Sequence, residues 1–250
     1  MLKEERFQKI LEMLQQADII KMADITATLG VTEMTVRRDL KALEEQELLT
    51  RIYGGAKKKQ NILSKELSHG EKKTIHIAEK RYIAQLAASQ VAENDAIYIG
   101  PGTTSELIYD FLTVAYAKII TNSLDVFLKF REDKRFELLF IGGRFRSQTD
   151  VFVGNFTNEI LEKIRVKIAF VGTNGIYNNN VTTSNEEEGT CQKIILDNSS
   201  KRYILCDSSK IDKEDFYSFY KLADVTGIIT DDKITEANIK RYEKIVKIIY

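Results

Sequence analysis

The chain has 250 residues, enough for one large or two modest domains, and 43% of them are hydrophobic, enough for a sizeable core. Its 37 basic and 37 acidic residues cancel, so any contact with nucleic acid must come from a local basic patch. There is no apolar run of about eighteen residues and no signal peptide at the start. We therefore expect a cytoplasmic protein that does not enter a membrane.

Residues 3–16 have the pattern of an amphipathic helix. Phe7, Ile10 and Leu14 recur at helical spacing, and charged residues occupy the opposite face. We expect this helix to brace the elements that follow it.

Residues 18–56 contain a short apolar helix, a turn at Leu29-Gly30-Val31 and a second helix that begins after Thr32. The Thr32 hydroxyl can accept a free backbone N–H at the helix start. Val36, Leu40 and Leu43 form one apolar stripe on the second helix. Two helices joined across a glycine turn indicate a helix-turn-helix.

The other face of the second helix is basic and rich in hydroxyl groups, with Met34, Arg38 and Lys41 at its centre and Thr35 and Arg37 on its flanks. Such side chains near the start of a recognition helix suit base edges and phosphates. A surface helix with solvated charges would look similar, but the preceding helix and turn favour contact with DNA.

Residues 48–56 read as a wing, and three lysines follow them. The stretches 37–41 and 51–59 together hold seven cations and one acid, Asp39. Such charges can neutralise phosphates. The residues predicted to bind DNA are Thr32, Thr35, Arg37, Arg38, Lys41, Lys57 and Lys58.

We predict three parts: a mainly α winged helix-turn-helix domain over residues 1–56, a polar linker over 57–74 and an α/β domain over 75–250. In the last part a helix near 77–92 leads to a strand at 96–99. Further strands are expected at 118–121, 138–141, 168–171, 203–206 and 227–230. Short buried strands that alternate with helices indicate a mostly parallel sheet, whose ligands bind at the carboxyl ends of the strands.

The turn Gly102-Thr103-Thr104 follows the first of these strands and precedes a helix predicted over residues 105–114. Glycine lets the backbone approach an anion, and hydroxyls and a helix start can bind phosphate, although such turns also serve packing or capping. Lys80, Arg144, Arg146 and Lys210 could converge there or remain solvated surface charges. Neither the cysteines, Cys191 and Cys206, nor the histidines, His69 and His76, have metal-site spacing.

Taken together, these motifs resemble the DeoR family of bacterial transcriptional regulators. In the first part the resemblance rests on Arg6, Ile10, Leu14, Thr32-x-x-Thr35-Val36-Arg37-Arg38-Asp39-Leu40 and Arg51 with Gly54-Gly55-Ala56. In the second part it rests on Lys80-x-x-Ile83-Ala84, Gly102-Thr103-Thr104, Thr121-Asn122-Ser123, Gly142-Gly143, Val153-Gly154, Gly172-Thr173-Asn174-Gly175 and Ser208-Ser209-Lys210.

The resemblance implies a sensor domain similar to ribose-5-phosphate isomerase that binds a phosphorylated sugar and thereby releases operator DNA. No cofactor is implied, and a homodimer or homotetramer is expected because symmetric dimers match palindromic half-sites. The implied effector-binding residues are Lys80, Gly102, Thr103, Thr104, Asn122, Arg144, Asn174, Asp207 and Lys210.

Within the family the chain is most similar to members that regulate lactose and tagatose 6-phosphate genes in low-GC Gram-positive bacteria, which implies tagatose 6-phosphate as inducer. A sugar-phosphate isomerase with an appended DNA-binding module is the rival from another class. Asn174 stands where an isomerase would need an acid, and a carboxamide cannot act as a general base, so binding without turnover is favoured. Glu186, Glu187 and Glu188 form an acidic run nearby, which we expect to be a solvated loop. An activator, or a repressor with another inducer such as fructose 1-phosphate, stays open.

Overall fold

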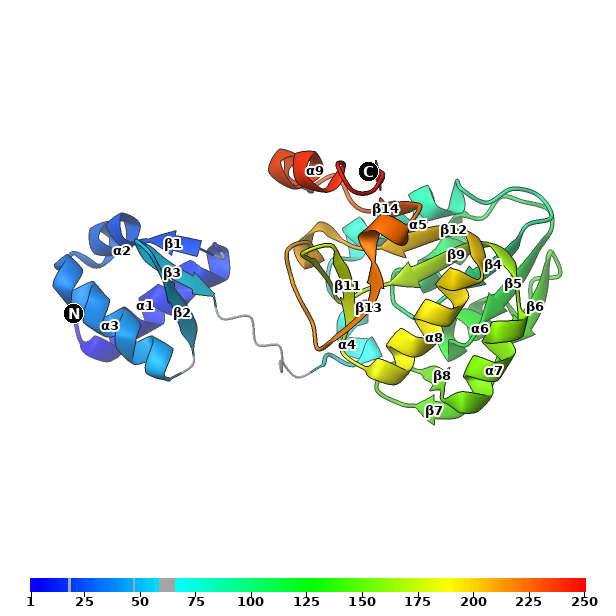
Figure 1. Ribbon diagram of the computed structural model, residues 1–250, viewed down its shortest axis with the longest axis horizontal. Coiled ribbons are helices and arrows are strands. Elements are labelled where there is room, and N and C mark those ends of the chain that lie inside the picture. Colours follow the sequence, from blue (N-terminus) through cyan, green and yellow to red (C-terminus); the bar gives the residue numbers. More distant parts are fainter. Residues whose placement is uncertain (18, 47, 59–65) are drawn as a thin grey trace. The chain divides into compact units, whose positions relative to one another are not determined.

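The computed structural model covers residues 1–250 and describes residues 1–17, 19–46, 48–58 and 66–250 (Figure 1). The chain divides into two compact units, Met1–Asn61 and Ile62–Tyr250. Within the described residues, no helix is long and apolar enough to cross a membrane.

The first unit packs three helices on a small antiparallel sheet of strand order β1-β3-β2. Its elements are α1 (Lys3–Gln16), β1 (Ile19–Lys21), α2 (Met22–Leu29), α3 (Glu33–Glu45), β2 (Leu49–Ile52) and β3 (Gly55–Lys58). Gly30 ends α2 at φ 63°, in the left-handed region that favours glycine, and this lets the chain turn into α3. The predicted helix-turn-helix with a β-hairpin wing is confirmed.

The apolar stripe of α3 faces the core of this unit. Val36, Leu40 and Leu43 are buried beside Ile10 and Leu14 of α1. The Thr32 side chain accepts the backbone N–H of Thr35 at 3.4 Å, as expected for the residue that caps the helix. The amphipathic pattern therefore fixes which face of α3 points outward.

A parallel sheet of seven strands, in the order β15-β14-β12-β9-β4-β5-β6, forms the centre of the second unit. Its strands are β4 (Ala96–Ile99), β5 (Ala117–Thr121), β6 (Phe136–Phe140), β9 (Val166–Gly172), β12 (Ser199–Leu205), β14 (Gly227–Ile229) and β15 (Ile248–Ile249). Each strand predicted from the sequence overlaps one of these, so the α/β fold class is confirmed.

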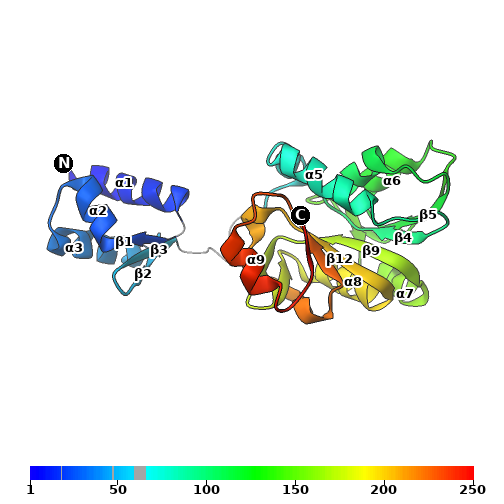
Figure 2. The same ribbon diagram turned by 90° about the horizontal axis from the view of Figure 1, so that it is seen from above.

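Helices cover both faces of the sheet (Figure 2). One face carries α5 (Ile77–Ala88), the 3-10 helix η1 (Ser105–Phe111) and α6 (Leu124–Phe130), whose apolar side chains pack against Ile97 and Ile99 of β4. The other face carries α7 (Asn155–Lys163) and α8 (Glu186–Asp197), which pack on the side of Tyr98. Successive strand residues thus face opposite cores, as expected for a sheet that is buried on both sides.

Smaller elements complete the described part of the second unit. Three strands, β10 (Gly175–Tyr177), β11 (Asn180–Thr183) and β13 (Tyr217–Lys221), form an antiparallel sheet, and β7 (Arg144–Arg146) pairs with β8 (Val151–Val153). The remaining elements are α4 (His69–Lys73), η2 (Ser208–Lys210), η3 (Leu222–Asp224) and α9 (Glu236–Tyr242).

Two details differ from the sequence-based expectation. The segment after Thr104 is a 3-10 helix of seven residues that ends at Phe111, rather than a longer helix. The stretch predicted as a linker over 57–74 includes the end of β3 and also α4, where His69 is buried. Charged residues there indicated solvent, but several of them have partners in the second unit, as described below. The domain boundaries derived from the sequence therefore stay a prediction.

Candidate functional site

The outward face of α3 is cationic. Arg37, Arg38 and Lys41 are exposed, on the side of the helix opposite the buried Leu40 and Leu43. Thr32 is also exposed, and its hydroxyl lies 3.1 Å from the hydroxyl of the half-buried Thr35. Five of the predicted DNA-binding side chains therefore lie on or beside one helix face near its first turns.

Ion pairs hold two of these cations loosely. Arg37 lies 3.5 Å from Glu33, and Lys41 lies 3.8 Å from Glu45, with all four side chains well exposed. Arg38 makes no ion pair within the described residues. Exposed pairs of this kind contribute about 0–1 kcal/mol, so these cations can exchange their partners for phosphate oxygens at little cost.

The β2–β3 hairpin lies beside this face. Arg51 pairs with Glu44 of α3 at 2.6 Å, which ties the hairpin to the helix, and Tyr53 at the hairpin tip is fully exposed. A groove between hairpin and helix is lined by Met22, Glu33, Arg37, Leu40, Arg51, Ile52, Tyr53, Gly54 and Gly55. Lys57 is half-buried in β3, whereas the side chain of Lys58 lies outside the described part of the chain.

Asp39 is the one acid in the basic stretches 37–41 and 51–59, and its role is structural. It is buried, and Arg6 of α1 donates to its two carboxylate oxygens at 2.6 and 3.0 Å. This fork geometry is the strong form of an arginine–carboxylate pair. The acid therefore ties α1 to α3 and leaves the outward face positive.

The second unit has a cleft at the carboxyl ends of β4, β9 and β12, the neighbouring strands at the centre of the sheet. Two adjoining pockets that share Lys72, Thr103, Asn174 and Lys210 make up this cleft. Among the predicted effector-binding residues, its lining includes Lys80, Gly102, Thr103, Thr104, Asn174, Asp207 and Lys210. The fold thus brings together side chains from four separate stretches of the sequence.

The turn after β4 supplies backbone and hydroxyl groups to this cleft. Gly102 has φ 138°, a conformation that other residues rarely adopt, so the sequence needs glycine there. Ser105 Oγ and, on α8, Gln192 Oε1 are buried in the cleft lining without a hydrogen-bond partner among the described residues. Unpaired buried polar groups are costly, which favours a polar ligand in this cleft.

Three lysines converge on the cleft. The pKa of Lys80 is lowered to about 8, first by burial and then by the charges of Lys210 and Lys72, against the opposing charge of Asp207. Burial also lowers the pKa of Lys72, with a contribution from Lys210. Lysines whose positive charges lower each other's pKa repel one another, and a bound anion would relieve this repulsion.

Asp207 faces these lysines from the end of β12. Burial raises its pKa, but Lys210 at 3.6 Å and a hydrogen bond from Ser209 outweigh this and leave the pKa below its usual value. Lys210 also donates to the backbone oxygen of Thr173 at 2.9 Å. An ionised carboxylate and ammonium groups together can bind both the hydroxyls and the phosphate of a sugar phosphate.

Two predicted residues lie outside the cleft lining. Asn122 is buried, accepts a hydrogen bond from Tyr98 at 2.6 Å and donates to the backbone oxygen of Phe152 at 2.7 Å, so both ends of its amide serve the fold. Arg144 is exposed and pairs with Glu187. The family resemblance suggested Asn122, and the charge of Arg144 suggested that it could reach the turn. Here both side chains make contacts within the fold, and their part in effector binding stays a prediction.

The sequence interpretation missed an acidic and hydroxylic part of the lining. Glu188 was taken as part of a solvated loop, yet it lies in the first turn of α8 and is 6% exposed. Thr149 donates to it at 2.5 Å, and Arg146 at 2.9 Å. The signal for a helix was Asn185, whose side chain accepts two backbone N–H groups at the start of α8.

A second missed acid, Asp215, accepts a hydrogen bond from the Asn174 amide at 2.8 Å. Asn174 and Asp215 both line the cleft. Position 174 itself lacks a carboxylate, but its hydrogen-bond partner Asp215 supplies one. Nothing in the local sequence pattern around Asn174 indicated this neighbour.

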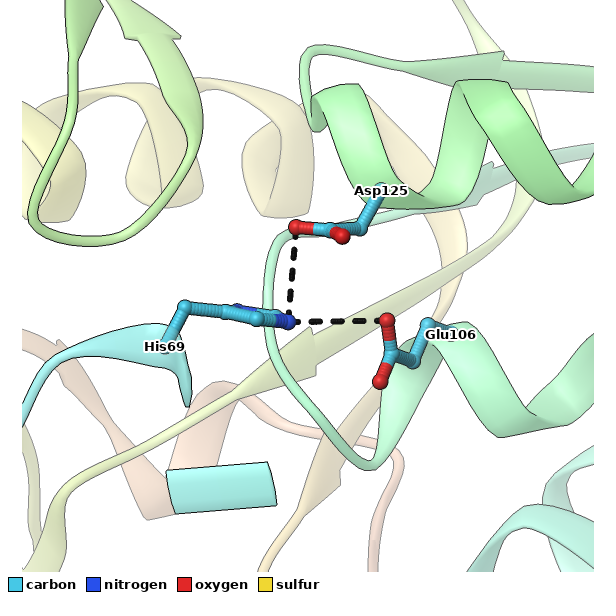
Figure 3. A group of neighbouring side chains, drawn as sticks. All are labelled: His69, Glu106 and Asp125. Carbon is cyan, nitrogen blue, oxygen red and sulfur yellow. Dashed lines mark ion pairs between the residues drawn. The ribbon is translucent and has the colours of Figure 1, made fainter. Parts of the chain in front are cut away.

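His69 of α4, which lines the cleft, lies against two acids (Figure 3). Its Nε2 is 3.5 Å from Glu106 Oε2 and 3.4 Å from Asp125 Oδ2. The three donor atoms could hold a metal ion by their chemistry and spacing. Lys73, however, places its ammonium 3.2 Å from Glu106 and 3.5 Å from Asp125, so positive charge already fills this position.

A winged helix-turn-helix with a cationic face, joined in one chain to an α/β unit with an anion-attracting cleft, defines the class of ligand-responsive DNA-binding regulators. The DeoR-like helix-turn-helix domain matches residues 6–61, and the DeoR C-terminal sensor domain matches residues 75–232. The chain therefore belongs to the DeoR family.

Relatives match almost the whole chain. It is 42% identical to the lactose phosphotransferase system repressor of Streptococcus mutans, over 98% of this chain and 100% of the relative. It is 40% identical to the repressor of the same name from Staphylococcus aureus strain N315, over 98% and 99%. Among solved structures, ribose 5-phosphate isomerase A from Methanocaldococcus jannaschii aligns with a TM-score of 0.38 at 20% identity and covers 53% of each chain.

Proposed function

We propose that this protein is a transcriptional repressor of a sugar-catabolic operon and that a phosphorylated sugar releases it from operator DNA. The observation that carries the proposal is the cleft in which Lys72, Lys80 and Lys210 converge beside the Gly102-Thr103-Thr104 turn, in the same chain as a winged helix-turn-helix. The relatives named as lactose phosphotransferase system repressors, similar over nearly the full length, support the regulatory role.

The DNA contacts follow from the exposed face of α3. Thr35, Arg37, Arg38 and Lys41 enter the major groove or contact its phosphates, Thr32 lies at the edge of this surface, and Lys57 and Lys58 contact the backbone. An arginine that binds guanine with two hydrogen bonds contributes about 1–3 kcal/mol of discrimination. A homodimer or homotetramer would place two such helices on a palindromic operator.

The effector contacts follow from the cleft. Gly102, Thr103 and Thr104 bind the phosphate together with the lysines, while Asn174 and Asp207 bind sugar hydroxyls. For release, the effector must bind more tightly to the arrangement that cannot hold DNA, and typical couplings of about 1–3 kcal/mol change DNA affinity roughly 5- to 150-fold. We propose tagatose 6-phosphate as the effector, lactose and galactose catabolism as the regulated process, and the cytoplasm as the location.

Fluorescence anisotropy of the protein on labelled DNA from upstream of its own operon, titrated with a panel of sugar phosphates, tests the proposal. Release by tagatose 6-phosphate alone supports the repressor and its effector. Release by another member of the panel, such as fructose 1-phosphate, keeps the mechanism and replaces the effector. DNA that stays bound with every member contradicts a sugar-phosphate sensor. Mapping the operator against the promoter separates a repressor from an activator.

An isomerase is the second candidate, because Asp207, Asp215 and Glu188 bring three carboxyl groups to the cleft. We infer that none of them acts as a base, since each has a partner within the fold. Asp207 is paired with Lys210, Asp215 accepts from Asn174, and Glu188 accepts from Arg146 and Thr149. NMR of sugar phosphates in deuterated buffer tests this inference. Exchange of carbon-bound protons that depends on the protein would make it an enzyme.

A further inference from the structure

One wall of the cleft comes from residues 66–73, which follow the DNA-binding unit closely in the chain; we call them the 66–73 segment. Glu66, His69 and Lys72 all line the cleft. The backbone of this segment is fastened to the second unit, because Gln148 donates to the Glu66 carbonyl at 2.7 Å and receives the His69 N–H at 3.0 Å.

The Glu66 side chain adds ionic contacts to this attachment. It receives hydrogen bonds from Arg146 and from Ser184, the latter at 2.6 Å. Arg146 also pairs with Glu188, which lines the cleft. The segment is therefore joined to the cleft residues rather than resting on an unrelated surface.

Lys72 is the cation of this segment that faces the cleft. Its ammonium lies 3.9 Å from Glu66 Oε1, a distance beyond a hydrogen bond, so the charge is only partly compensated. Lys80 donates to the backbone oxygen of Lys72 at the end of α4. Lys80 is thus connected to Lys72 by a hydrogen bond to the backbone of α4.

The neighbouring side chains His69 and Lys73 hold α4 in place. Both lie against Glu106 and Asp125, and Figure 3 shows this contact for His69. Glu106 belongs to η1, the helix that directly follows the turn at Gly102. The short helix α4 therefore contacts the cleft through Lys72 and the region next to the turn through Lys73.

We propose that Lys72 binds the anionic group of the effector and that the 66–73 segment transmits this binding to the DNA-binding unit. The inference rests on the proposed function. A phosphate at the turn would attract both Lys72 and Lys80, and Lys80 would then leave the Lys72 carbonyl. Within the described residues, the segment is the part of the second unit nearest in the chain to the DNA-binding unit, and we infer that a change in its bonds reaches that unit along the chain.

The first experiment compares Lys72→Met with Lys163→Met in the full chain. Methionine keeps most of the side-chain volume and removes the charge, and Lys163 is an exposed lysine on α7. Titration calorimetry with tagatose 6-phosphate and with inorganic phosphate measures affinity. We expect Lys72→Met to bind both about tenfold or more weakly, as for loss of one charge-assisted hydrogen bond, and Lys163→Met to match the unaltered protein.

The second experiment tests transmission with Lys73→Met, whose ammonium faces Glu106 and Asp125. The coupling factor is the ratio of DNA affinities with and without saturating tagatose 6-phosphate. We expect this factor to change severalfold while the affinity for tagatose 6-phosphate stays within about threefold. Hydrogen exchange of the His69 amide should also change when the effector binds to the unaltered protein.

The outcomes separate the inference from the function on which it rests. If the unaltered protein binds no sugar phosphate, the proposed function is wrong. If it binds and releases DNA, but Lys72→Met binds tagatose 6-phosphate with normal affinity, Lys72 is not an effector ligand. A normal coupling factor in Lys73→Met, together with unchanged exchange at His69, refutes transmission through the 66–73 segment.

Discussion

Arg38 offers the cleanest test of the DNA-binding surface. It is exposed on α3 and makes no ion pair within the described residues, so Arg38→Ala leaves no described acid without its partner. The free energy of unfolding should change by less than about 0.5 kcal/mol, as for other surface substitutions. Any loss of operator affinity is therefore a loss of DNA contact.

The size of the loss depends on what Arg38 touches. A bidentate contact with guanine is worth about 1–3 kcal/mol, which is roughly 5- to 150-fold per half-site and more on a two-fold symmetric operator. A contact with phosphate alone should lower the slope of log affinity against log salt by about 0.9 per contact and weaken all DNA sequences alike.

Fluorescence anisotropy on operator and on scrambled DNA, at several salt concentrations, distinguishes these cases. Lys9→Ala is the matched control, because it removes an exposed charge from α1 rather than from α3. Arg38→Ala should also bind the sugar phosphate normally. If its operator affinity and salt slope equal those of the control, the assignment of the outward face of α3 as the DNA-binding surface is wrong.

Three further predictions concern the cleft and the core. Lys210→Ala should bind operator normally but need about tenfold more sugar phosphate for release in the same assay; a normal release curve removes Lys210 from the site. Because the pKa of Lys80 is about 8, its ammonium loses its proton above that pH, so effector affinity by calorimetry should fall from about pH 7 to about pH 9, and Lys80→Met should flatten this dependence. Leu40→Ala should destabilise the first unit by about 2–5 kcal/mol, because Leu40 is buried; differential scanning calorimetry should show an earlier transition for that unit alone, and a single shifted transition contradicts independent units.

The sequence predicted those parts of the fold that local physics controls. Thr32 has the hydroxyl that caps α3, Gly30 has the freedom to turn, and the apolar stripe through Leu40 can face only the core. The strands were recognisable because a parallel sheet buried on both faces needs continuous apolar runs such as 96–99. These features depend on residues a few positions apart, which is the range over which a sequence pattern is informative.

Contacts between distant stretches were not predictable in this way. Asn122 looked like a ligand residue, but Tyr98 and Phe152 take both ends of its amide. Glu188 looked solvated, but the start of α8 turns it toward Arg146 and Thr149. In each case the partners lie between 24 and 42 positions away in the chain. Only the fold brings them close to the side chain.

The charge balance of the cleft gives a physical reason why an effector that binds there would also release operator DNA, as proposed above. Backbone carbonyls and acids hold the lysines of the cleft: Lys80 donates to the Lys72 carbonyl, and Lys210 lies between Asp207 and the Thr173 carbonyl. A phosphate competes for these same ammonium groups, so it cannot bind without altering the contacts that they make. In the proposed mechanism, an effector that contacted only the turn at Gly102 could bind tightly and leave α4 unchanged, and it would then shift no equilibrium. The proposed effect of the ligand on DNA binding therefore comes from the bonds that the lysines exchange.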